Sequence, residues 1–260
     1  VNARHTPRVL PPSEIAMREW PHRAQHLFTM TVAHPCPYIE GRLERDVVAD
    51  LNVPNAQSFY DWLLRSGFRR VQHMAYRPAC PGCSACVPVR IRVAGMEPTR
   101  SQRTVLRRNA DLAHTIVPLT ATQEQYQLFL RYQKSRHADG EMATMTFHDY
   151  RMMVEESPID TQVVEFRGEE GQLIAVCLTD RVRDGLSAVY KFYDPDAARR
   201  SLGTRIVLWH IDRARELGLP YVYLGYWVKN SGKMGYKADF QPLELFDGDA
   251  WRPMAEGDLA

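Results

Sequence analysis

The clearest helical pattern lies in the second half of the chain, over residues 202–217. Apolar residues recur there every three or four positions, so Val207 and Ile211 would share one face while charged side chains occupy the other. Gly218 and Pro220 follow directly, and both residue types are typical of the end of a helix. The pattern therefore predicts a helix that buries one apolar face and ends before Gly218.

Three further helix starts are predicted from the spacing of capping residues. A Ser or Thr followed three residues later by Asp or Gln can form reciprocal hydrogen bonds across the first turn of a helix. These pairs are Ser58 with Asp61, Thr122 with Gln125, and Thr146 with Asp149. We expect the first of these helices to end at Gly67.

Segments rich in β-branched and aromatic residues predict the strands. The expected strands cover 68–77, 87–93, 163–166, 173–179, 186–192 and 221–226. Asp184 and Gly185 suit a tight hairpin between the fourth and the fifth of these. The predicted order is helices, then an antiparallel meander, and then a helix followed by a strand. This order predicts an α+β fold, and it is similar to the order of elements in acetyltransferase-like (GNAT) proteins.

The composition is that of a folded and nearly neutral protein. A chain of 260 residues that is 45% hydrophobic can bury one large core or two modest ones, and its formal net charge of +2 permits local basic patches only. Near residues 95–99 we place a boundary between an N-terminal lobe, 1–97, and a second unit, 98–260. No segment approaches the roughly 20 apolar residues of a membrane helix, and the N-terminus lacks the apolar core of a secretory signal. We therefore expect a cytoplasmic protein with no membrane partner.

Residues 225–244 combine aromatic rings with lysines in a Gly-punctuated segment that follows a predicted strand. The rings and cations are Tyr226, Trp227, Lys229, Lys233, Tyr236, Lys237 and Phe240. Flat rings together with flexible cations suit the end of a nucleotide or an acidic substrate. The alternative is a solvated loop whose aromatic residues are incidental.

Three motifs occur together in one order along the chain. They are Cys36-Pro-Tyr-Ile-Glu-Gly41, Tyr190-Lys-Phe-Tyr-Asp-Pro195, and the segment 221–244. With these motifs the chain resembles the bacterial aminoacyl-tRNA–protein transferases from about residue 35 to residue 251. The resemblance is to their leucyl-transferring branch, which is related to the eukaryotic arginyl-tRNA–protein transferases.

The resemblance implies both a fold and an activity. The fold would be GNAT-like, with a smaller Cys-containing N-terminal lobe. The activity would be transfer of leucine from leucyl-tRNA to the α-amine of proteins that begin with Asp or Glu, which marks them for N-degron proteolysis.

Two other functions are open on the sequence. A coenzyme-A-dependent N-acetyltransferase has the same broad fold, and a non-catalytic, metal-stabilised module would bind charged and uncharged tRNA alike. Gly203 lies where an acetyltransferase holds a pyrophosphate at the start of a helix. Arg205, however, replaces a second small residue there, and its bulk disfavours coenzyme A.

An aminoacyl ester is already activated, so its transfer to an amine needs neither ATP nor a redox cofactor. The site must mainly hold the amine and the ester together and donate a hydrogen bond to the developing oxyanion. The candidate catalytic residues are four tyrosines at the ends of predicted strands, Tyr190, Tyr193, Tyr223 and Tyr226. An acidic acceptor must be paired with cations when it leaves water. The candidate substrate-binding residues are Arg77, Lys191, Trp227, Lys233, Tyr236 and Lys237.

A group of arginines is a candidate for contact with tRNA. These residues are Arg100, Arg103, Arg107, Arg108, Arg200 and Arg205. Spacings of three and four residues would place Arg100, Arg103 and Arg107 on one helical face that can follow a phosphate backbone. The alternative is a charged face that is merely solvated.

The five cysteines are an odd number, which speaks against a disulfide framework in a reducing compartment. The candidate metal ligands, for zinc or an iron–sulfur cluster, are Cys36, Cys80, Cys83 and Cys86. The related eukaryotic enzymes carry an iron–sulfur cluster, although Ile39 here replaces the second Cys of their C-x-x-C motif. The alternative is a set of reduced thiols that shape a turn, and Cys177 is expected in the core. Surface or capping roles are expected for the isolated histidines His114, His137 and His148.

Overall fold

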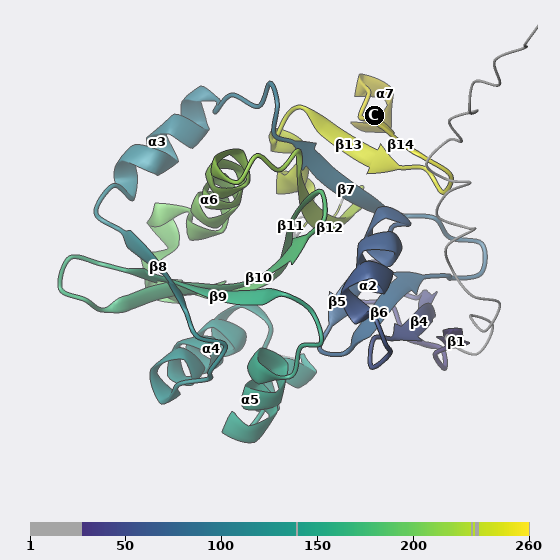
Figure 1. Ribbon diagram of the computed structural model, residues 1–260, viewed down its shortest axis with the longest axis horizontal. Helices are drawn as coiled ribbons and strands as arrows, with labels where there is room; N and C mark the ends of the chain where they lie inside the picture. The colour runs from purple at the N-terminus through teal and green to yellow at the C-terminus, as the bar shows by residue number, and fades with distance from the viewer. Residues whose placement is uncertain (1–27, 139, 230, 232–233, 260) are drawn as a thin grey trace, which may run out of the picture.

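The computed structural model describes residues 28–138, 140–229, 231 and 234–259. Its main feature is an eight-stranded mixed sheet with the order β14-β13-β7-β12-β11-β10-β9-β8 (Figure 1). The strands are β7 (Cys86–Arg92), β8 (Ala113–Val117), β9 (Thr161–Arg167), β10 (Leu173–Val182), β11 (Gly185–Tyr193), β12 (Tyr221–Val228), β13 (Leu243–Phe246) and β14 (Trp251–Pro253). Neighbours in this sheet are antiparallel except β11 and β12, which are parallel. The fold is therefore of the mixed α+β class.

Helices cover both faces of the large sheet (Figure 1). On one face, α6 (Leu202–Glu216) packs on β11 and β12, and α3 (Arg100–Arg108) packs beside α6. On the other, α4 (Gln123–Arg136) packs on β10 and β11, and α5 (Phe147–Glu155) packs on α4. The short helices are η2 (Glu141–Thr144), η3 (Pro195–Arg200), η4 (Gly235–Asp239) and α7 (Glu256–Leu259). Among the described helices, none has the length and apolar character needed to span a bilayer.

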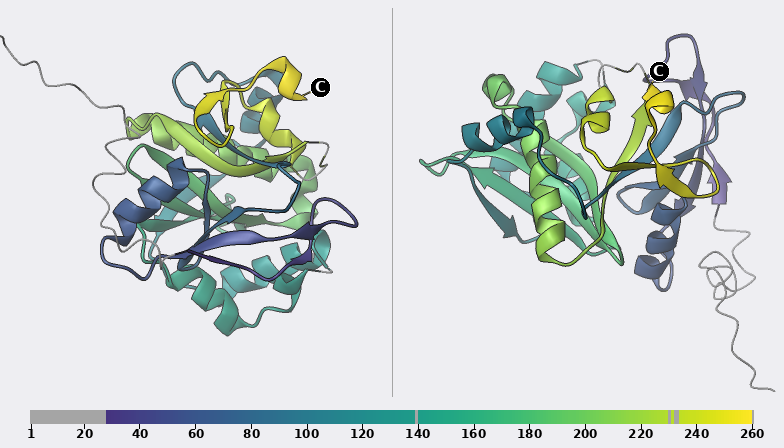
Figure 2. Two further views of the ribbon diagram at one scale, coloured as in Figure 1. Left: turned by 90° about the vertical axis from the view of Figure 1, so that its right-hand side faces the viewer. Right: turned by 90° about the horizontal axis from the view of Figure 1, so that it is seen from above.

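A smaller four-stranded sheet stands beside the large one, with the order β1-β4-β6-β5. Its strands are β1 (Phe28–Met30), β4 (Asp46–Asp50), β5 (Arg69–Val71) and β6 (Met74–Pro78). Helix α2 (Ala56–Arg65) packs its apolar residues into one core with this sheet. Strands β2 (His34–Pro35) and β3 (Leu43–Glu44) form a separate hairpin. Figure 2 shows this purple and blue region next to the yellow C-terminal strands, where the Trp251 indole donates to the Arg65 carbonyl at 2.7 Å.

The parallel strands β11 and β12 pair only at their beginnings, 185–187 with 221–223. Beyond that point the carbonyls of Ala188 and Val189 accept hydrogen bonds from the guanidinium of Arg69, which comes from β5. Gly225 has a φ of +74°, and a Cβ at this position would lie 2.3 Å from the Arg69 side chain. Glycine is therefore required here so that Arg69 can enter the wedge between the two strands.

Most of the predicted elements are confirmed. The apolar pattern over 202–217 is helix α6, and Thr122 and Thr146 form capping boxes at the starts of α4 and α5. A two-residue turn joins Val182 to Gly185 and makes the expected hairpin of β10 and β11. Local signals were sufficient to predict these elements because a capping box, a helical apolar period and a two-residue turn are each encoded within a few neighbouring residues.

Two predictions about the N-terminal region were wrong. Helix α2 begins at Ala56, so Ser58 lies inside it and not at its start. The segment 68–77 is not one strand but the hairpin of β5 and β6, with Gln72 at a φ of +50° in the turn. Strand β7, within the predicted lobe 1–97, is a strand of the large sheet. The division into lobes at residue 97 stays a prediction.

Candidate active site

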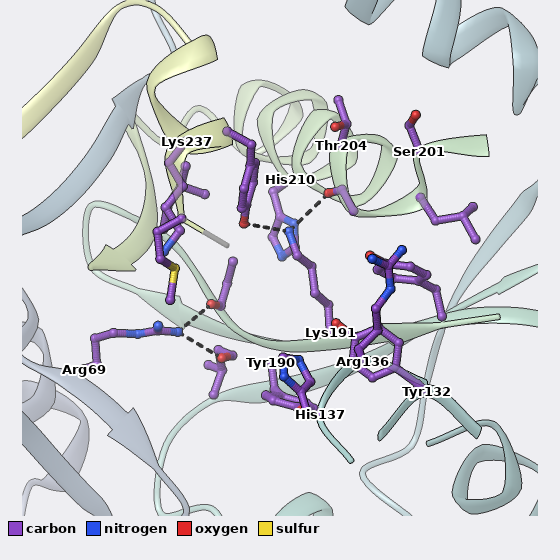
Figure 3. A pocket seen from close by; sticks show the side chains of 18 of the residues that line it. Arg69, Tyr132, Arg136, His137, Tyr190, Lys191, Ser201, Thr204, His210 and Lys237 are labelled. Carbon is purple, nitrogen blue, oxygen red and sulfur yellow. Dashed lines mark hydrogen bonds between the residues drawn. The ribbon is translucent and has the colours of Figure 1, made fainter. Parts of the chain in front are cut away.

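A cavity of about 650 Å³ opens where β11 and β12 diverge (Figure 3). Its walls come from β11, the end of α4, the start of α6, η4, β5 and the turn between β2 and β3. The predicted site residues that line it are Tyr190, Lys191, Tyr193, Tyr236 and Lys237. Its size lies within the range of small-molecule sites in proteins.

Lys191 extends from β11 into this cavity (Figure 3). Its ammonium donates to the Gly203 carbonyl at 3.1 Å and to the Tyr236 hydroxyl at 3.2 Å. It also lies 5.0 Å from the centroid of the Tyr236 ring, which is within cation–π range. These contacts use two of its three N–H groups and leave the third to reach a ligand.

Arg69 closes the end of the cavity where β11 leaves β12 (Figure 3). One of its terminal nitrogens donates to the carbonyls of Ala188 and Val189, at 3.2 and 3.0 Å. Both acceptors are uncharged, so these bonds hold the guanidinium in place without neutralising it. A guanidinium has five N–H donors and can bind a carboxylate or phosphate through two of them.

Lys237 brings a third basic side chain to the same place. It is 3% exposed and donates to the Tyr226 carbonyl. Burial is the main reason that its pKa is held well below the usual value, and the nearby charges of Arg69 and Lys191 lower it further. The ion pairs formed by the described residues include none of these three cations. The cavity is therefore suited to a ligand that carries a negative charge.

Tyr190 and Tyr193, both on β11, supply hydroxyl groups to the wall of the cavity. The side-chain amide of Gln133 donates to the Tyr190 hydroxyl, which leaves the phenolic proton available to a ligand. Burial raises the pKa of Tyr190, so this group stays protonated at neutral pH. The Tyr193 ring packs edge-on against Tyr132, with centroids 4.9 Å apart.

His210 also lines the cavity, but both of its ring nitrogens are engaged. Nδ1 donates to the Ile206 carbonyl and Nε2 accepts from the Thr179 hydroxyl, each at 2.8 Å. Burial lowers its pKa to about 4, so the ring is neutral at physiological pH. His210 therefore supports the wall of the cavity and has no nitrogen left for proton transfer.

Two of the four predicted catalytic tyrosines do not line the cavity. The Tyr223 hydroxyl bonds to Asp184 and Arg90, and the Tyr226 hydroxyl lies 2.9 Å from the Tyr76 carbonyl. The pairing of β12 with β7 shifts register between Tyr223 and Gly225, so both rings face the N-terminal sheet. The expectation that all four hydroxyls face one cleft is therefore corrected for this pair.

Arg77 and Trp227 line a second cavity, of about 790 Å³, beside the cysteine turn. Arg77 donates to the Ser66 carbonyl at 3.0 Å, and the Trp227 indole nitrogen is buried without a hydrogen-bond partner. Neither residue belongs to the set around Lys191. Lys233 lies outside the described residues.

The predicted tRNA-binding arginines line neither cavity, although Arg200 and Arg205 flank the lining residues Ser201 and Thr204. The four arginines of α3 are exposed, and Arg108 donates to the Arg199 carbonyl, which brings α3 against η3. Arg200 forms an ion pair with Asp111, and the Arg205 guanidinium lies 5.7 Å from the centroid of the Phe166 ring. Burial lowers the pKa of Arg205. Their contact with tRNA stays a prediction.

The four candidate cysteine ligands are brought near one another. Burial raises the pKa of the Cys86 thiol to about 12, and Glu44 and the three other cysteines add to this shift. Among the described residues, however, no three of these sulfurs all lie within 4.8 Å of one another. A tetrahedral zinc site with Zn–S bonds of about 2.3 Å requires closer sulfurs. Zinc therefore does not fit this arrangement without movement of the turn, and metal binding by the thiols stays a prediction.

Several residues of the cavity were missed by the sequence analysis, above all Arg69. Tyr38, Tyr132 and Arg136 also line it, as does His137, which caps the end of α4 as expected for a capping histidine. The only local signal for Arg69 was a cation inside a predicted strand. Its approach to β11 depends on contacts between residues more than one hundred positions apart in the sequence.

The sequence matches known proteins over most of its length. The N-terminal part of the arginine-tRNA-protein transferase family matches residues 34–104, and the C-terminal part of that family matches residues 124–247. An aspartate/glutamate leucyltransferase of Paramagnetospirillum magneticum is 53% identical over 244 residues, which cover 94% of this chain and 100% of that protein. Another, of Granulibacter bethesdensis, is 51% identical over 92% of this chain and 89% of its own.

Similarity to solved structures is weaker. FemX aligns over 75% of this chain and 66% of its own, with 9% identity and a TM-score of 0.44, which is too low to assign a fold. The sequence matches, in contrast, cover both the N-terminal region and the cavity. The chain therefore belongs to the arginine-tRNA-protein transferase family.

Proposed function

We propose that this chain transfers leucine from leucyl-tRNA to the α-amine of proteins that begin with Asp or Glu. The observation that carries the proposal is the charge of the cavity. Arg69, Lys191 and Lys237 converge there, and none of the described residues that line the cavity is acidic. Such a site favours an acidic acceptor side chain, and the names of the two relatives agree with this acceptor.

The preference for a leucyl over an arginyl donor follows from the same lining residues of the cavity. An arginyl group would meet the positive charges of Arg69 and Lys191, whereas Val189, Leu202 and Leu224 offer apolar surface to a leucyl side chain. We therefore propose leucyl-tRNA as the donor. The product would carry a new N-terminal leucine, which we expect to direct it to N-degron proteolysis in the cytoplasm.

The chemistry requires little beyond positioning. An α-amine has a pKa of about 8 and is partly neutral at cellular pH, so it can attack the ester once both are held together. The Tyr190 hydroxyl and the Lys191 ammonium each have an N–H or O–H left to stabilise the oxyanion that forms. We propose these two groups, with Tyr193 beside them, as the catalytic residues.

We further propose that the cavity is the cleft of a GNAT-like fold. Parallel β11 and β12 that separate around a site, with α6 connecting them, support this interpretation. Ser201 and Thr204 line the cavity at the start of α6, where unpaired N–H groups attract phosphate. This helix end would bind the terminal phosphate of the tRNA.

The test is a transfer assay with the full-length chain. Labelled leucyl-tRNA, arginyl-tRNA and acetyl-coenzyme A are each offered to matched peptides that begin with Asp, Glu, Asn or Gln, and products are identified by mass. We expect leucyl products on the Asp and Glu peptides, at least tenfold faster than on their amides. Acetylated peptide in place of leucylated peptide would replace the proposal with an acetyltransferase. Binding of tRNA without any product would indicate a non-catalytic module.

A further inference from the structure

An imidazole and two carboxylates converge at the base of the β2–β3 hairpin, outside the two cavities. His34 in β2 is the cross-strand partner of Glu44 in β3. Glu44 and Asp46 are two residues apart on extended backbone, so their side chains point to the same side. The ligand atoms of all three residues lie within 4.8 Å of one another.

The two carboxylates interact with each other, but one oxygen of each is buried without a hydrogen-bond partner. Asp46 is 8% exposed, and its Oδ1 atom and the Oε2 atom of Glu44 are buried with no hydrogen-bond partner. Burial is the main reason that the pKa of each carboxyl group is raised; the charge of Asp46 raises the pKa of Glu44 further, and the nearby His34 imidazole opposes both shifts. No arginine or lysine among the described residues forms an ion pair with either group. A buried carboxylate beside a half-buried one favours either a shared proton or a cation between them.

We propose that His34, Glu44 and Asp46 bind one divalent metal ion. One nitrogen and two oxygen ligands suit Zn²⁺ and Mn²⁺, with water in the remaining positions. The buried Asp46 forms the inner side of the site, and the exposed His34 leaves a route by which the ion enters. Zn²⁺ is expected to bind more tightly than Mn²⁺, because affinities for one site rise in that order.

The ion would fix one wall of the active-site cavity. Hairpin β2–β3 pairs with no other strand in the described sheets, whereas Asp46 belongs to the four-stranded sheet. The turn of this hairpin carries Tyr38, which lines the cavity, and Arg69 lies close enough to lower the pKa of Tyr38 against the stronger effect of burial. An ion that joins His34 to Asp46 would therefore tie the hairpin to the sheet and hold Tyr38 over Arg69. This role is separate from the chemistry of acyl transfer.

The site must be distinguished from the cysteine group, because Glu44 is also close to Cys86. Mn²⁺ provides this distinction, since it prefers carboxylate and water oxygen and has little affinity for thiolate. The full-length chain, treated with a chelator and dialysed, is titrated with Mn²⁺ while free Mn²⁺ is followed by electron paramagnetic resonance. We expect one saturable Mn²⁺ per chain, displaced by Zn²⁺. A titration without saturable Mn²⁺ would overturn the proposal in favour of a shared proton.

Substitutions of the proposed ligands test whether the Mn²⁺ ion binds at His34, Glu44 and Asp46. His34→Ala and Asp46→Asn are each expected to weaken Mn²⁺ binding at least about tenfold, because even residues around metal ligands contribute this much. Asp50→Asn removes an exposed carboxylate of the same strand, and Cys83→Ser removes a thiol, so both are expected to bind Mn²⁺ as the wild type does. Equal affinity in all four variants would contradict the site, and a loss confined to Cys83→Ser would assign the ion to the thiols.

A measurement on the wild-type chain keeps the proposal testable if a variant does not fold. Arg42 is exposed in the segment between β2 and β3, and Arg103 is exposed on α3. Mn²⁺ is expected to slow tryptic cleavage after Arg42 severalfold and to leave cleavage after Arg103 unchanged. Equal rates with and without Mn²⁺ at Arg42, or equal slowing at both sites, would contradict a metal-held hairpin.

Discussion

Arg69 and Arg70 are neighbours on β5, but their side chains have opposite surroundings. Arg70 is 5% exposed and donates to both carboxylate oxygens of Asp180, at 2.7 and 2.6 Å. Arg69 lines the cavity, and its hydrogen bonds go to the uncharged carbonyls of Ala188 and Val189. Because successive residues of a strand point to opposite sides, one short strand provides both a structural ion pair and a cation that is available to a ligand.

The difference shows that the partner of a buried charge indicates its role better than burial alone. The Asp180 carboxylate also accepts from the Thr161 hydroxyl at 2.6 Å, so the Arg70 pair is neutralised and fully bonded within the protein. The charges of Arg69 and Lys191 have no such carboxylate among the described residues that line the cavity. Both are therefore available to pair with an anionic ligand.

The largest effect is expected when the ion pair between Arg70 and Asp180 is broken. Asp180→Asn leaves the Arg70 charge buried without its counter-ion, and loss of one partner of a buried pair lowers the free energy of unfolding by about 3 to 5 kcal/mol. Urea denaturation measures this change. The matched control is Asp212→Asn, whose partner Arg215 is 50% exposed, for which about 0 to 1 kcal/mol is expected. Similar small changes in both variants would contradict a structural role for the Asp180 pair.

His210 lines the cavity, but like Arg70 it is fully bonded within the protein, because both of its ring nitrogens form hydrogen bonds. Its folded pKa of about 4 lies below the ordinary 6.5, so between these values the unfolded chain binds more protons than the folded chain. Its contribution to stability is therefore full above pH 6.5 and declines as the pH falls, by about 3 kcal/mol at pH 4. The free energy of unfolding is measured from pH 7 to 4.

His210→Gln should remove this part of the pH dependence. His148→Gln, which changes an exposed histidine, should keep the wild-type profile. Parallel profiles of the wild type and His210→Gln would show that the histidine ring is not held neutral.

The variant Arg69→Gln tests whether the cation that has no carboxylate partner recognises an acidic substrate. Truncation of a cation that pairs with a desolvated carboxylate is expected to lower kcat/KM for a peptide that begins with Asp by about 2 kcal/mol, or roughly thirtyfold. The rate for the Asn peptide should change little, so discrimination between the two should largely disappear. Arg181→Gln, an exposed change on β10, is the control. An equal loss on both peptides would indicate that Arg69 only supports the strands.

Elements with strong local signals were predictable from the sequence. Helices α4 and α5 begin at their capping boxes, and α6 follows its apolar pattern to the predicted end. Part of the lining of the cavity was also predictable, because Lys191, Tyr236 and Lys237 lie in segments whose composition is unusual for a core. In each case the information is contained within a few neighbouring residues.

The rest of the site depends on long-range contacts that no local pattern encodes. Arg69 reaches the cavity because β5 packs against the open edge of β11, and Gly225 leaves the space that it needs. Tyr226 was expected in the cleft, but the register shift before Gly225 turns it toward β6. A shift of one residue in a strand reverses the side to which a side chain points, and such a shift is not visible in composition.

The smallest effect is expected for the exposed cations of α3, which contrast most with Arg69. Arg103 donates to the Pro98 carbonyl at 2.5 Å and Arg107 to the Thr104 hydroxyl at 3.2 Å, and both side chains are exposed. If they bind phosphates of the donor tRNA, each lost contact should reduce the slope of log affinity against log salt concentration by about 0.7 to 0.9. The double variant Arg103→Ala and Arg107→Ala should therefore lower the slope by roughly 1.5.

Turnover at saturating leucyl-tRNA should stay close to that of the wild type, because contacts outside the cavity stabilise the ground state and the transition state equally. The measurements are leucyl-tRNA binding over a salt series and single-turnover rates at saturation. An unchanged slope with intact affinity would leave these arginines as a solvated face. A loss of the single-turnover rate at saturation alone would instead indicate that Arg103 and Arg107 act in catalysis, as proposed for Lys191. The contrast between the exposed arginines of α3, which bind tRNA, and Arg69, which recognises the acceptor, would then be wrong.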